Sequence, residues 1–264
     1  MKVILHADDF GFDKDTVHAT IDLLECGALT SATIMVTMPA ADEAMAYAAA
    51  HPEKSFGVHL TYVDGIRPVC SREEIPSLTD GNGLFLESNA VRKKALCLGI
   101  SREEIVRESL AQIKRVQAGG VRVSHLDSHG HLHKFPSILL ALKDITASSG
   151  VKKVRRVQNV FIEPPHFGPS SVLNGMFGCY ISRNFLTTDY FYMSANCMDT
   201  DWSDTIIRHM DALPDDAVIE VGVHPGLADN EGERWRIAEY NDMKLFAERI
   251  RCDGRHKIIT WNDL

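Results

Sequence analysis

Short runs of β-branched and apolar residues recur along the whole chain, each with the length of a β-strand. Turn residues or stretches with a helical period separate most of them, so the runs are bounded as strands are in α/β proteins. The pattern predicts strands at residues 2–7, 31–37, 55–61, 122–127, 153–158, 217–223 and 256–260.

Three stretches between these runs carry helix signals. Residues 14–26 have a helical period and stop before a glycine, the residue most suited to end a helix. Ser101 has a glutamate three positions later, the pattern of a capping box, and predicts a helix to about residue 117. Residues 136–150 begin with a proline, which fits the first turn, and end at a glycine.

Alternating strands and helices indicate a mostly parallel sheet, and their number favours a closed or nearly closed barrel over an open sheet. The 264 residues are close to the roughly 250 that one such barrel needs, so we expect a single domain over residues 1–264. Residues 62–100 and 159–200 lack a clean period. We expect loop excursions there that form walls of a substrate site.

The acidic balance, with 28 Lys and Arg against 36 Asp and Glu, argues against binding nucleic acid or an anionic membrane. The one short basic run, residues 152–156, alternates with apolar residues like a strand. A structural role is therefore favoured for this run, with an active-site arginine as the alternative.

The six cysteines form no CxxC pair, which fits reduced thiols in a cytosol. No apolar run approaches the roughly 20 residues that cross a bilayer, and the first residues turn acidic too early for a signal peptide. We expect a cytoplasmic protein and keep a homodimer open as its assembly state.

Candidate chemistry follows the strands, because reactive groups of such folds gather at the carboxyl ends of the strands. Asp8 and Asp9 follow the first strand, where one carboxylate can bind a cation while the other accepts a proton. A helix cap is the alternative for either aspartate. His59 lies near the end of the third strand, where a lone histidine is more often an ordinary polar residue.

The segment Ser124–His133 has polar residues at every second position, including His125, Asp127 and His129. A strand places these on one face, and buried imidazoles and carboxylates need partners there. A metal ion would supply them, whereas a histidine-rich surface loop is the alternative. A glycine at position 130 turns the chain, so His131 and His133 are expected to lie outside direct contact with the ion.

His224, followed by Pro-Gly, ends the strand at 217–223. A histidine in this position is a candidate general acid, because its usual pKa lies near neutrality. An ordinary turn histidine is the alternative.

Together these motifs resemble the YdjC-like carbohydrate deacetylases, which include the chitin-disaccharide (chito-oligosaccharide) deacetylases. The resemblance extends through essentially the whole chain. Its motifs are Ala7–Gly11, Ala28–Thr33, Gly57–Thr61, His125–His129 and His224–Gly226, of which the long histidine motif is the most specific.

The resemblance implies a deformed TIM-like barrel that removes an N-acetyl group from an amino sugar and releases acetate. It implies a divalent ion, Mg²⁺ or Zn²⁺, and an N-acetylated sugar as substrate. The roles it implies are metal ligation by Asp9, His59 and His129, a general base at Asp8, a general acid at His224, and orientation of the ligands by His125 and Asp127.

Two other readings remain. An amidohydrolase or phosphoesterase would carry a His-x-His pair where Asp8 and Asp9 stand. A catalytically silent sugar-binding or regulatory barrel would have lost the base or the acid, yet Asp8 and His224 are both present. The aromatic residues Tyr62, Phe161, Trp202 and Trp235 are as suited to the core as to stacking on sugar rings.

Overall fold

A parallel sheet occupies the centre of the molecule. The structure is a computed structural model, and it describes residues 1–162, 168–194, 202–229 and 233–264. Neighbouring strands in the sheet follow the order β4-β3-β2-β1-β6-β5, with β7 paired to the first residues of β1. The strands are β1 (Lys2–Phe10), β2 (Ser31–Ile34), β3 (Ser55–Leu60), β4 (Val123–Ser128), β5 (Tyr190–Met193), β6 (Val218–Val223) and β7 (Lys257–Ile259).

An irregular segment at residues 153–160 joins the two ends of this sheet. The backbone N–H of Leu126 in β4 donates to the carbonyl of Lys153 at 2.9 Å, and the N–H of Asn159 donates to the carbonyl of Phe191 in β5 at 3.2 Å. The sheet therefore curves into a deformed TIM-like barrel, as expected. The regular strand predicted at 153–158 is wrong, because this segment follows β4 at one end and β5 at the other and keeps regular register with neither.

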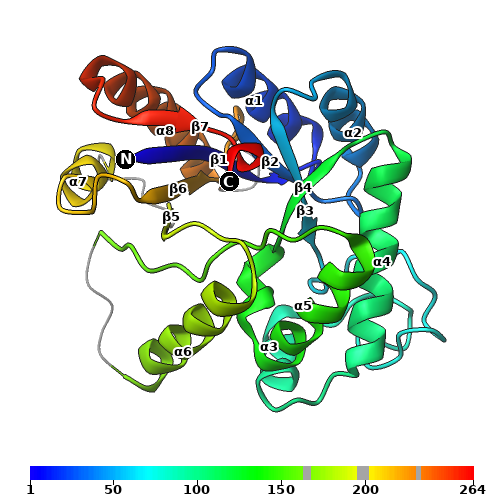
Figure 1. Cartoon of the computed structure of the whole chain (residues 1–264). Coiled ribbons are helices and arrows are strands. Elements are labelled where there is room, and N and C mark those ends of the chain that lie inside the picture. The colour runs from blue at the N-terminus through cyan, green and yellow to red at the C-terminus, as the bar shows by residue number, and fades with distance from the viewer. Residues whose placement is uncertain (163–167, 195–201, 230–232) are drawn as a thin grey trace.

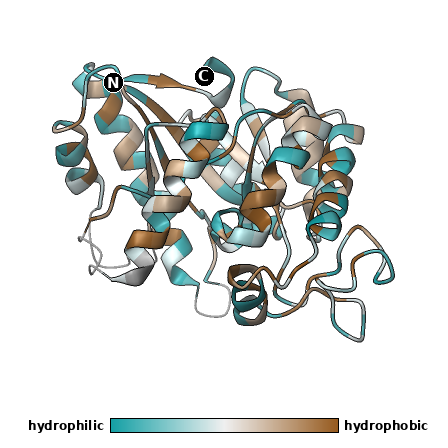
Figure 2. Cartoon of the chain, turned by 60° about the horizontal axis from the view of Figure 1, so that its bottom comes forward, coloured by the Kyte–Doolittle hydropathy of each residue, from teal (hydrophilic) through white to brown (hydrophobic). Residues whose placement is uncertain are grey.

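Helices surround the strands (Figure 1). Apolar residues run along the sheet, whereas the helices alternate between apolar and polar residues (Figure 2). The helices are α1 (Lys14–Glu25), α2 (Ala41–Ala50), α3 (Ser88–Leu96), α4 (Arg102–Ala118), α5 (Pro136–Ser149), α6 (Pro169–Asn184), α7 (Trp202–Met210) and α8 (Arg234–Asp253), with short 3₁₀ turns η1 (His129–Lys134) and η2 (Trp261–Asp263).

The three helices predicted from end signals are confirmed as α1, α4 and α5. The capping box of α4 is only half formed. The hydroxyl of Ser101 accepts from the N–H of Glu104 at 3.4 Å, but the Glu104 carboxylate accepts instead from the N–H of Ser77 at 2.6 Å. Glu104 thus ties the first long excursion to the barrel.

The two predicted excursions are not simply loops. Residues 62–100 contain α3, and residues 159–200 contain α6 and β5. The sequence of α6 begins with a proline and includes glycines at 175 and 178, so its apolar residues give little helical periodicity. Ile181, with the partly buried Phe177 and Tyr180, packs α6 against the hydrophobic core.

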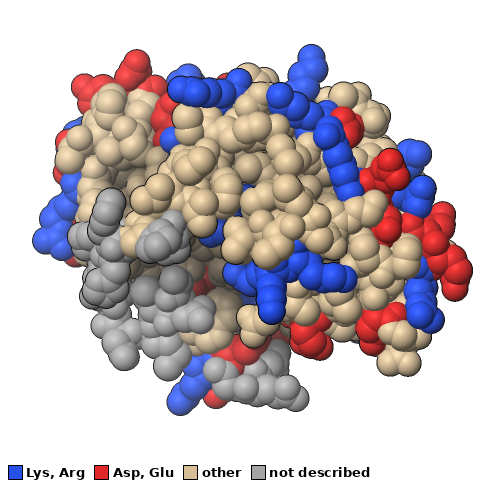
Figure 3. All heavy atoms as spheres, turned by 90° about the horizontal axis from the view of Figure 1, so that it is seen from below, with Lys and Arg blue, Asp and Glu red and all other residues tan. Residues whose placement is uncertain are grey.

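Lys and Arg are interspersed with Asp and Glu on the face seen in Figure 3. Within the described residues, no helix has both the length and the apolar character that crossing a membrane requires.

Candidate metal centre and active site

The end of β1 has an irregular backbone. The register between β1 and β2 shifts between Ala7 and Phe10, and Asp9 has a φ of 60°. Aspartate is one of the few residues other than glycine that enter this left-handed region. In a regular strand, Asp8 and Asp9 would point to opposite faces. The irregularity instead lets both carboxylates reach one polar centre.

Asp9 lies against two histidines from other strand ends. Its Oδ1 is 3.4 Å from Nε2 of His59, at the end of β3, and 3.1 Å from Nδ1 of His129, directly after β4. The three candidate ligand atoms lie within 4.8 Å of one another. Oδ2 of Asp9 accepts from Nη2 of Arg236, in α8, at 2.9 Å. The group is nearly enclosed, with a side-chain exposure of 26% at His129 as its open side.

His59 is held from behind by a buried carboxylate. Its Nδ1 is 2.8 Å from Oδ1 of Asp127, and Thr33 donates to Oδ2 of the same aspartate at 3.0 Å. A carboxylate on the far nitrogen of a histidine is typical of metal sites, where it fixes the ring and its tautomer. Asp127 is therefore placed to orient His59.

Neighbouring carboxylates favour positive charge at both candidate ligand histidines. Burial alone would lower the pKa of His59, but Asp127 and Asp8 raise it to about 10. Burial likewise opposes the shift at His129, where hydrogen bonds to Asp64 and Asp9 raise the pKa to about 9. The carboxylates that favour a proton here favour a metal ion for the same reason. One carboxylate oxygen with two imidazole nitrogens suits Zn²⁺ and also admits Mg²⁺.

Asp8 lies in a different environment, beside Arg155. Nη1 of Arg155 donates to Oδ2 of Asp8 at 2.8 Å and lies 2.5 Å from Oδ2 of Asp127, while Nη2 donates to Glu220 at 2.8 Å. All four side chains are buried. Burial raises the pKa of Asp8, but the charges of Arg155 and His59 outweigh it and hold the pKa well below its usual range.

Arg155 lies in the short basic run for which the sequence favours a structural role, with an active-site arginine as the alternative. Its contacts fit both roles, because it holds the buried Asp127 and Glu220 and also contacts Asp8 directly. One feature of the sequence pointed to such contacts. Glu220 stands inside the apolar strand Val218–Val223, and a charge buried there needs a cationic partner.

His224 follows β6 and approaches Asp8 from the other side. Its Nε2 is 3.9 Å from Oδ2 of Asp8, and its Nδ1 is 3.3 Å from Oε2 of the buried Glu239 in α8. The same oxygen accepts from the His224 backbone N–H at 2.5 Å. Burial opposes it, yet Glu239 raises the pKa of His224 above its usual value. Sequence reasoning missed Glu239, because one glutamate on a polar helix carries no distinguishing mark.

The four aromatic residues considered for stacking on sugar rings lie in different parts of the molecule. Trp202 and Tyr62 are fully buried in the core. The ring of Trp235 lies edge-on to His224, with centroids 5.6 Å apart. Phe161 lines a separate cavity.

The other histidines of the Ser124–His133 segment lie apart from the candidate ligands. The ring of His125 stacks on Trp261 at 4.4 Å, lies edge-on to His6 at 5.3 Å, and its Nδ1 pairs with Ser124. None of these partners is a candidate ligand, so the orienting role of His125 stays a prediction. The glycine at 130 has a φ of 60°, and the chain turns there as expected. His133 consequently pairs with Ser128 at 2.8 Å, and His131 lies against Phe191.

A barrel with paired aspartates and histidines at the carboxyl ends of parallel strands defines an α/β-barrel protein with a candidate divalent-metal centre. The chain belongs to the YdjC-like protein family, whose pattern matches residues 2–254. A carbohydrate deacetylase of Brevibacillus brevis is 32% identical over 275 aligned positions, which cover 100% of both chains. A carbohydrate deacetylase of Vibrio campbellii is 30% identical, covering 87% of this chain and 80% of the relative.

A solved structure from Enterococcus faecalis V583, described as a candidate cellobiose-phosphate cleavage protein, has the same fold. It superposes with a TM-score of 0.81 at 23% identity, covering 99% of this chain and 98% of the other. At this identity the likeness shows the fold alone.

Proposed function

We propose that this chain is a metal-dependent carbohydrate deacetylase that hydrolyses the N-acetyl group of an amino sugar such as a chito-oligosaccharide. The proposal is carried by one observation. The candidate ligands Asp9, His59 and His129 lie beside Asp8 and His224, two groups suited to move protons. The relatives named carbohydrate deacetylases support the same reaction.

Hydrolysis of an acetamide has two difficult steps, and each needs a proton transfer. Water forms a C–O bond to the acetyl carbon and loses a proton, and the C–N bond breaks as the nitrogen gains one. The products are acetate and a free amine. A bound divalent ion would polarise the acetyl oxygen and lower the pKa of water, so that a weak base suffices.

Asp8 is suited to accept the proton of water. Arg155 keeps its carboxylate ionised and fixes its orientation, at the cost of basicity. His224 is suited to donate to the leaving nitrogen, because Glu239 favours its protonated form. The two groups are 3.9 Å apart at their closest atoms, so a proton accepted by Asp8 is near the site where one is consumed.

The arrangement also bears on the rival readings. A silent sugar-binding barrel has no need for a buried carboxylate to hold a histidine at the rim, yet Glu239 does so. Asp8 and Asp9 occupy the strand end where a His-x-His metal hydrolase would place two histidines. Both features favour the deacetylase.

The test is release of acetate from N,N′-diacetylchitobiose by metal-stripped protein, with Mg²⁺, Zn²⁺, Mn²⁺ or Co²⁺ added back separately. We expect release with at least one ion and none without an ion. The Asp8→Asn protein serves as the control for contaminating activity. Release that is equal with and without ions would contradict metal dependence. No release from this or other N-acetylated sugars with any ion would contradict the deacetylase itself.

A further inference from the structure

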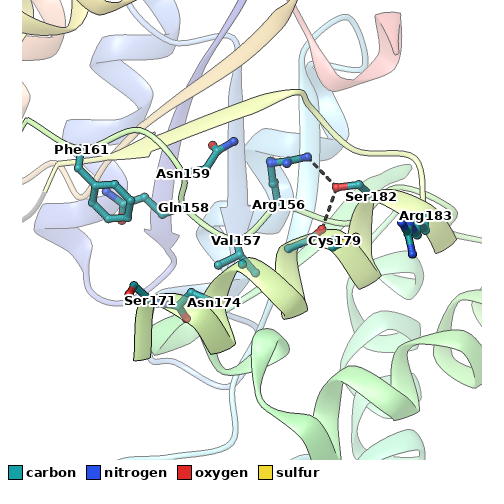
Figure 4. Close-up of a pocket in the computed structure, with 12 residues that line it drawn as sticks. Arg156, Val157, Gln158, Asn159, Phe161, Ser171, Asn174, Cys179, Ser182 and Arg183 are labelled. Carbon is teal, nitrogen blue, oxygen red and sulfur yellow. Dashed lines mark hydrogen bonds between the residues drawn. The ribbon is translucent and has the colours of Figure 1, made fainter. Parts of the chain in front are cut away.

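A cavity of about 610 Å³ lies between α6 and the segment at residues 156–161 (Figure 4). This volume is in the range of pockets that bind small molecules. None of Asp8, Asp9, His59, His129 or His224 lines it. The cavity is therefore separate from the candidate active site.

Among the described residues, the cavity wall carries positive charge only. Arg156 and Arg183 line it, and no aspartate or glutamate of the described chain does. Within the described part of the chain, neither arginine lies in an ion pair; Arg156 Nη1 donates to the hydroxyl of Ser182 at 2.7 Å. A guanidinium presents several N–H donors in a fixed fork, and an oxyanion is the ligand that this fork binds best.

The rest of the wall suits a hydroxylated molecule. Gln158 and Asn174 present amides, Ser171 a hydroxyl, and Phe161 an aromatic ring. Figure 4 shows Phe161 toward the end of α6 that carries Ser171 and Asn174, and Arg183 toward the other end. Amides can bind hydroxyl groups and a ring can cover the apolar face of a sugar.

The cavity is long enough for more than a bare ion. Asn174 and Ser182 both line it and are eight residues apart on α6, which corresponds to about 12 Å along the helix axis. A molecule that spans this length can place an anionic group on the arginines and hydroxyls on the amides. An isolated oxyanion would leave the amide end unused.

A smaller cleft continues from this cavity toward η1. It shares Arg156, Gln158 and Phe161 with the cavity and adds residues of η1, among them Lys134. Lys134 adds positive charge, and the described residues of this lining include no carboxylate. Since η1 begins at His129, one short turn borders both the cleft and the candidate metal group.

We propose that this cavity is a second binding site, for a small hydroxylated anion of the class of sugar acids and sugar phosphates. The oxyanion pairs with Arg156 and Arg183, and the hydroxyl groups bind the amides of Gln158 and Asn174. The assignment does not depend on the deacetylase reaction, because it concerns binding alone.

The test is calorimetric titration of the full-length, metal-stripped protein with D-glucuronate, D-glucose 6-phosphate, D-glucose and inorganic phosphate. We expect saturable binding of at least one anionic sugar. Binding of glucose should be weaker by about 10-fold or more, since a charge-assisted hydrogen bond contributes about 1.5–3 kcal/mol. Binding of phosphate should also be weaker, because phosphate carries no hydroxylated chain for the amides to bind. The stronger of the two anionic sugars identifies a carboxylate or a phosphate ligand. Failure of both to bind, or equal binding of glucose, would overturn the proposal.

Two variants locate the binding. A Cβ at Gly175 would meet no atom within 4 Å, so Gly175→Leu fills the cavity from α6 without a clash and also favours the helix. Arg156→Gln removes the charge. Both should weaken binding by about 10-fold or more, the loss expected for one charge-assisted contact. The matched control is Met176→Leu on the same helix, where the side chain is exposed and does not line the cavity. Equal binding by all three variants would place the ligand elsewhere.

Discussion

Asp8 and Asp9 are neighbours in the chain, but their carboxylates lie in two different chemical environments. Asp8 lies against Arg155, whose guanidinium is buried and stays protonated at any physiological pH. Asp9 lies against His59 and His129, whose imidazoles can release protons and bind a metal ion instead. Asp9 also accepts from Arg236 on its other oxygen, so the two candidate ligand imidazoles, and not the absence of a guanidinium, set it apart from Asp8.

The largest expected effect comes from removing the charge of Asp8 alone. Asp8→Asn should lower kcat for acetate release by about 10²–10⁴-fold, the usual contribution of a general base. Metal affinity should change little, because the candidate ligands surround Asp9. An acetate-release assay measures kcat, and a calorimetric titration of the same preparation measures the metal affinity. Unchanged acetate release would remove Asp8 from the mechanism, and loss of metal binding would make it a ligand.

Removing the permanent cation should destabilise the fold. Arg155→Met leaves three buried carboxylates, those of Asp8, Asp127 and Glu220, without their guanidinium, and should lower the free energy of unfolding by about 3–5 kcal/mol. Arg155→Lys keeps the positive charge, so its free energy of unfolding should fall by less. Urea unfolding measures both. An Arg155→Met protein as stable as the unchanged chain would show that the carboxylates are protonated or hydrated rather than paired.

Substitution of a histidine that contacts Asp9 should mainly weaken metal binding. His129→Ala removes a candidate ligand, so the affinity should fall by more than the roughly 10- to 100-fold typical of a residue that only orients a ligand. His131→Ala is the matched control, since it lies two residues away in the same turn but against Phe191. Equal losses in a calorimetric titration would mean that the candidate ligands are assigned wrongly.

The smallest expected effect concerns the pH dependence of turnover. Glu239 raises the pKa of His224, and the proposed acid works only while protonated, so kcat should fall as the pH rises through that pKa. Glu239→Gln removes the negative charge and lowers the pKa of His224. The alkaline limb of the kcat profile should therefore move to lower pH, with activity at acidic pH retained. Glu239→Asp keeps the negative charge, so the pKa of His224 should stay partly raised and the alkaline limb should move less. An alkaline limb at the same pH in the Glu239→Gln protein would show that Glu239 does not set the pKa of the proton donor.

The sequence predicted the strand ends that carry Asp8, Asp9, His59 and His224, because the ends of parallel strands converge whatever the loops do. It also predicted the turn at Gly130, since glycine adopts a positive φ at little cost. These are local rules. They need only the residue types and the order of the elements.

The partners of these residues could not be predicted in the same way. Arg155 meets Asp8 across 147 positions of sequence, and Glu239 meets His224 from a helix whose pattern marks no single residue. The segment around Arg155 has the alternation of a strand but closes the barrel irregularly. Long-range pairing depends on how the barrel closes, which local periodicity does not encode.

Arg155 and Arg236 also bear on how the protein would acquire the proposed ion. Their fixed positive charges neutralise part of the buried acidic cluster before any ion arrives. Small zinc domains, by contrast, fold only when metal binds. If the proposed ion binds here, this charge balance would let the chain fold first and be loaded afterwards. A folded ion-free reserve would then exist in a cell, and the active fraction would follow the supply of the metal rather than the rate of synthesis.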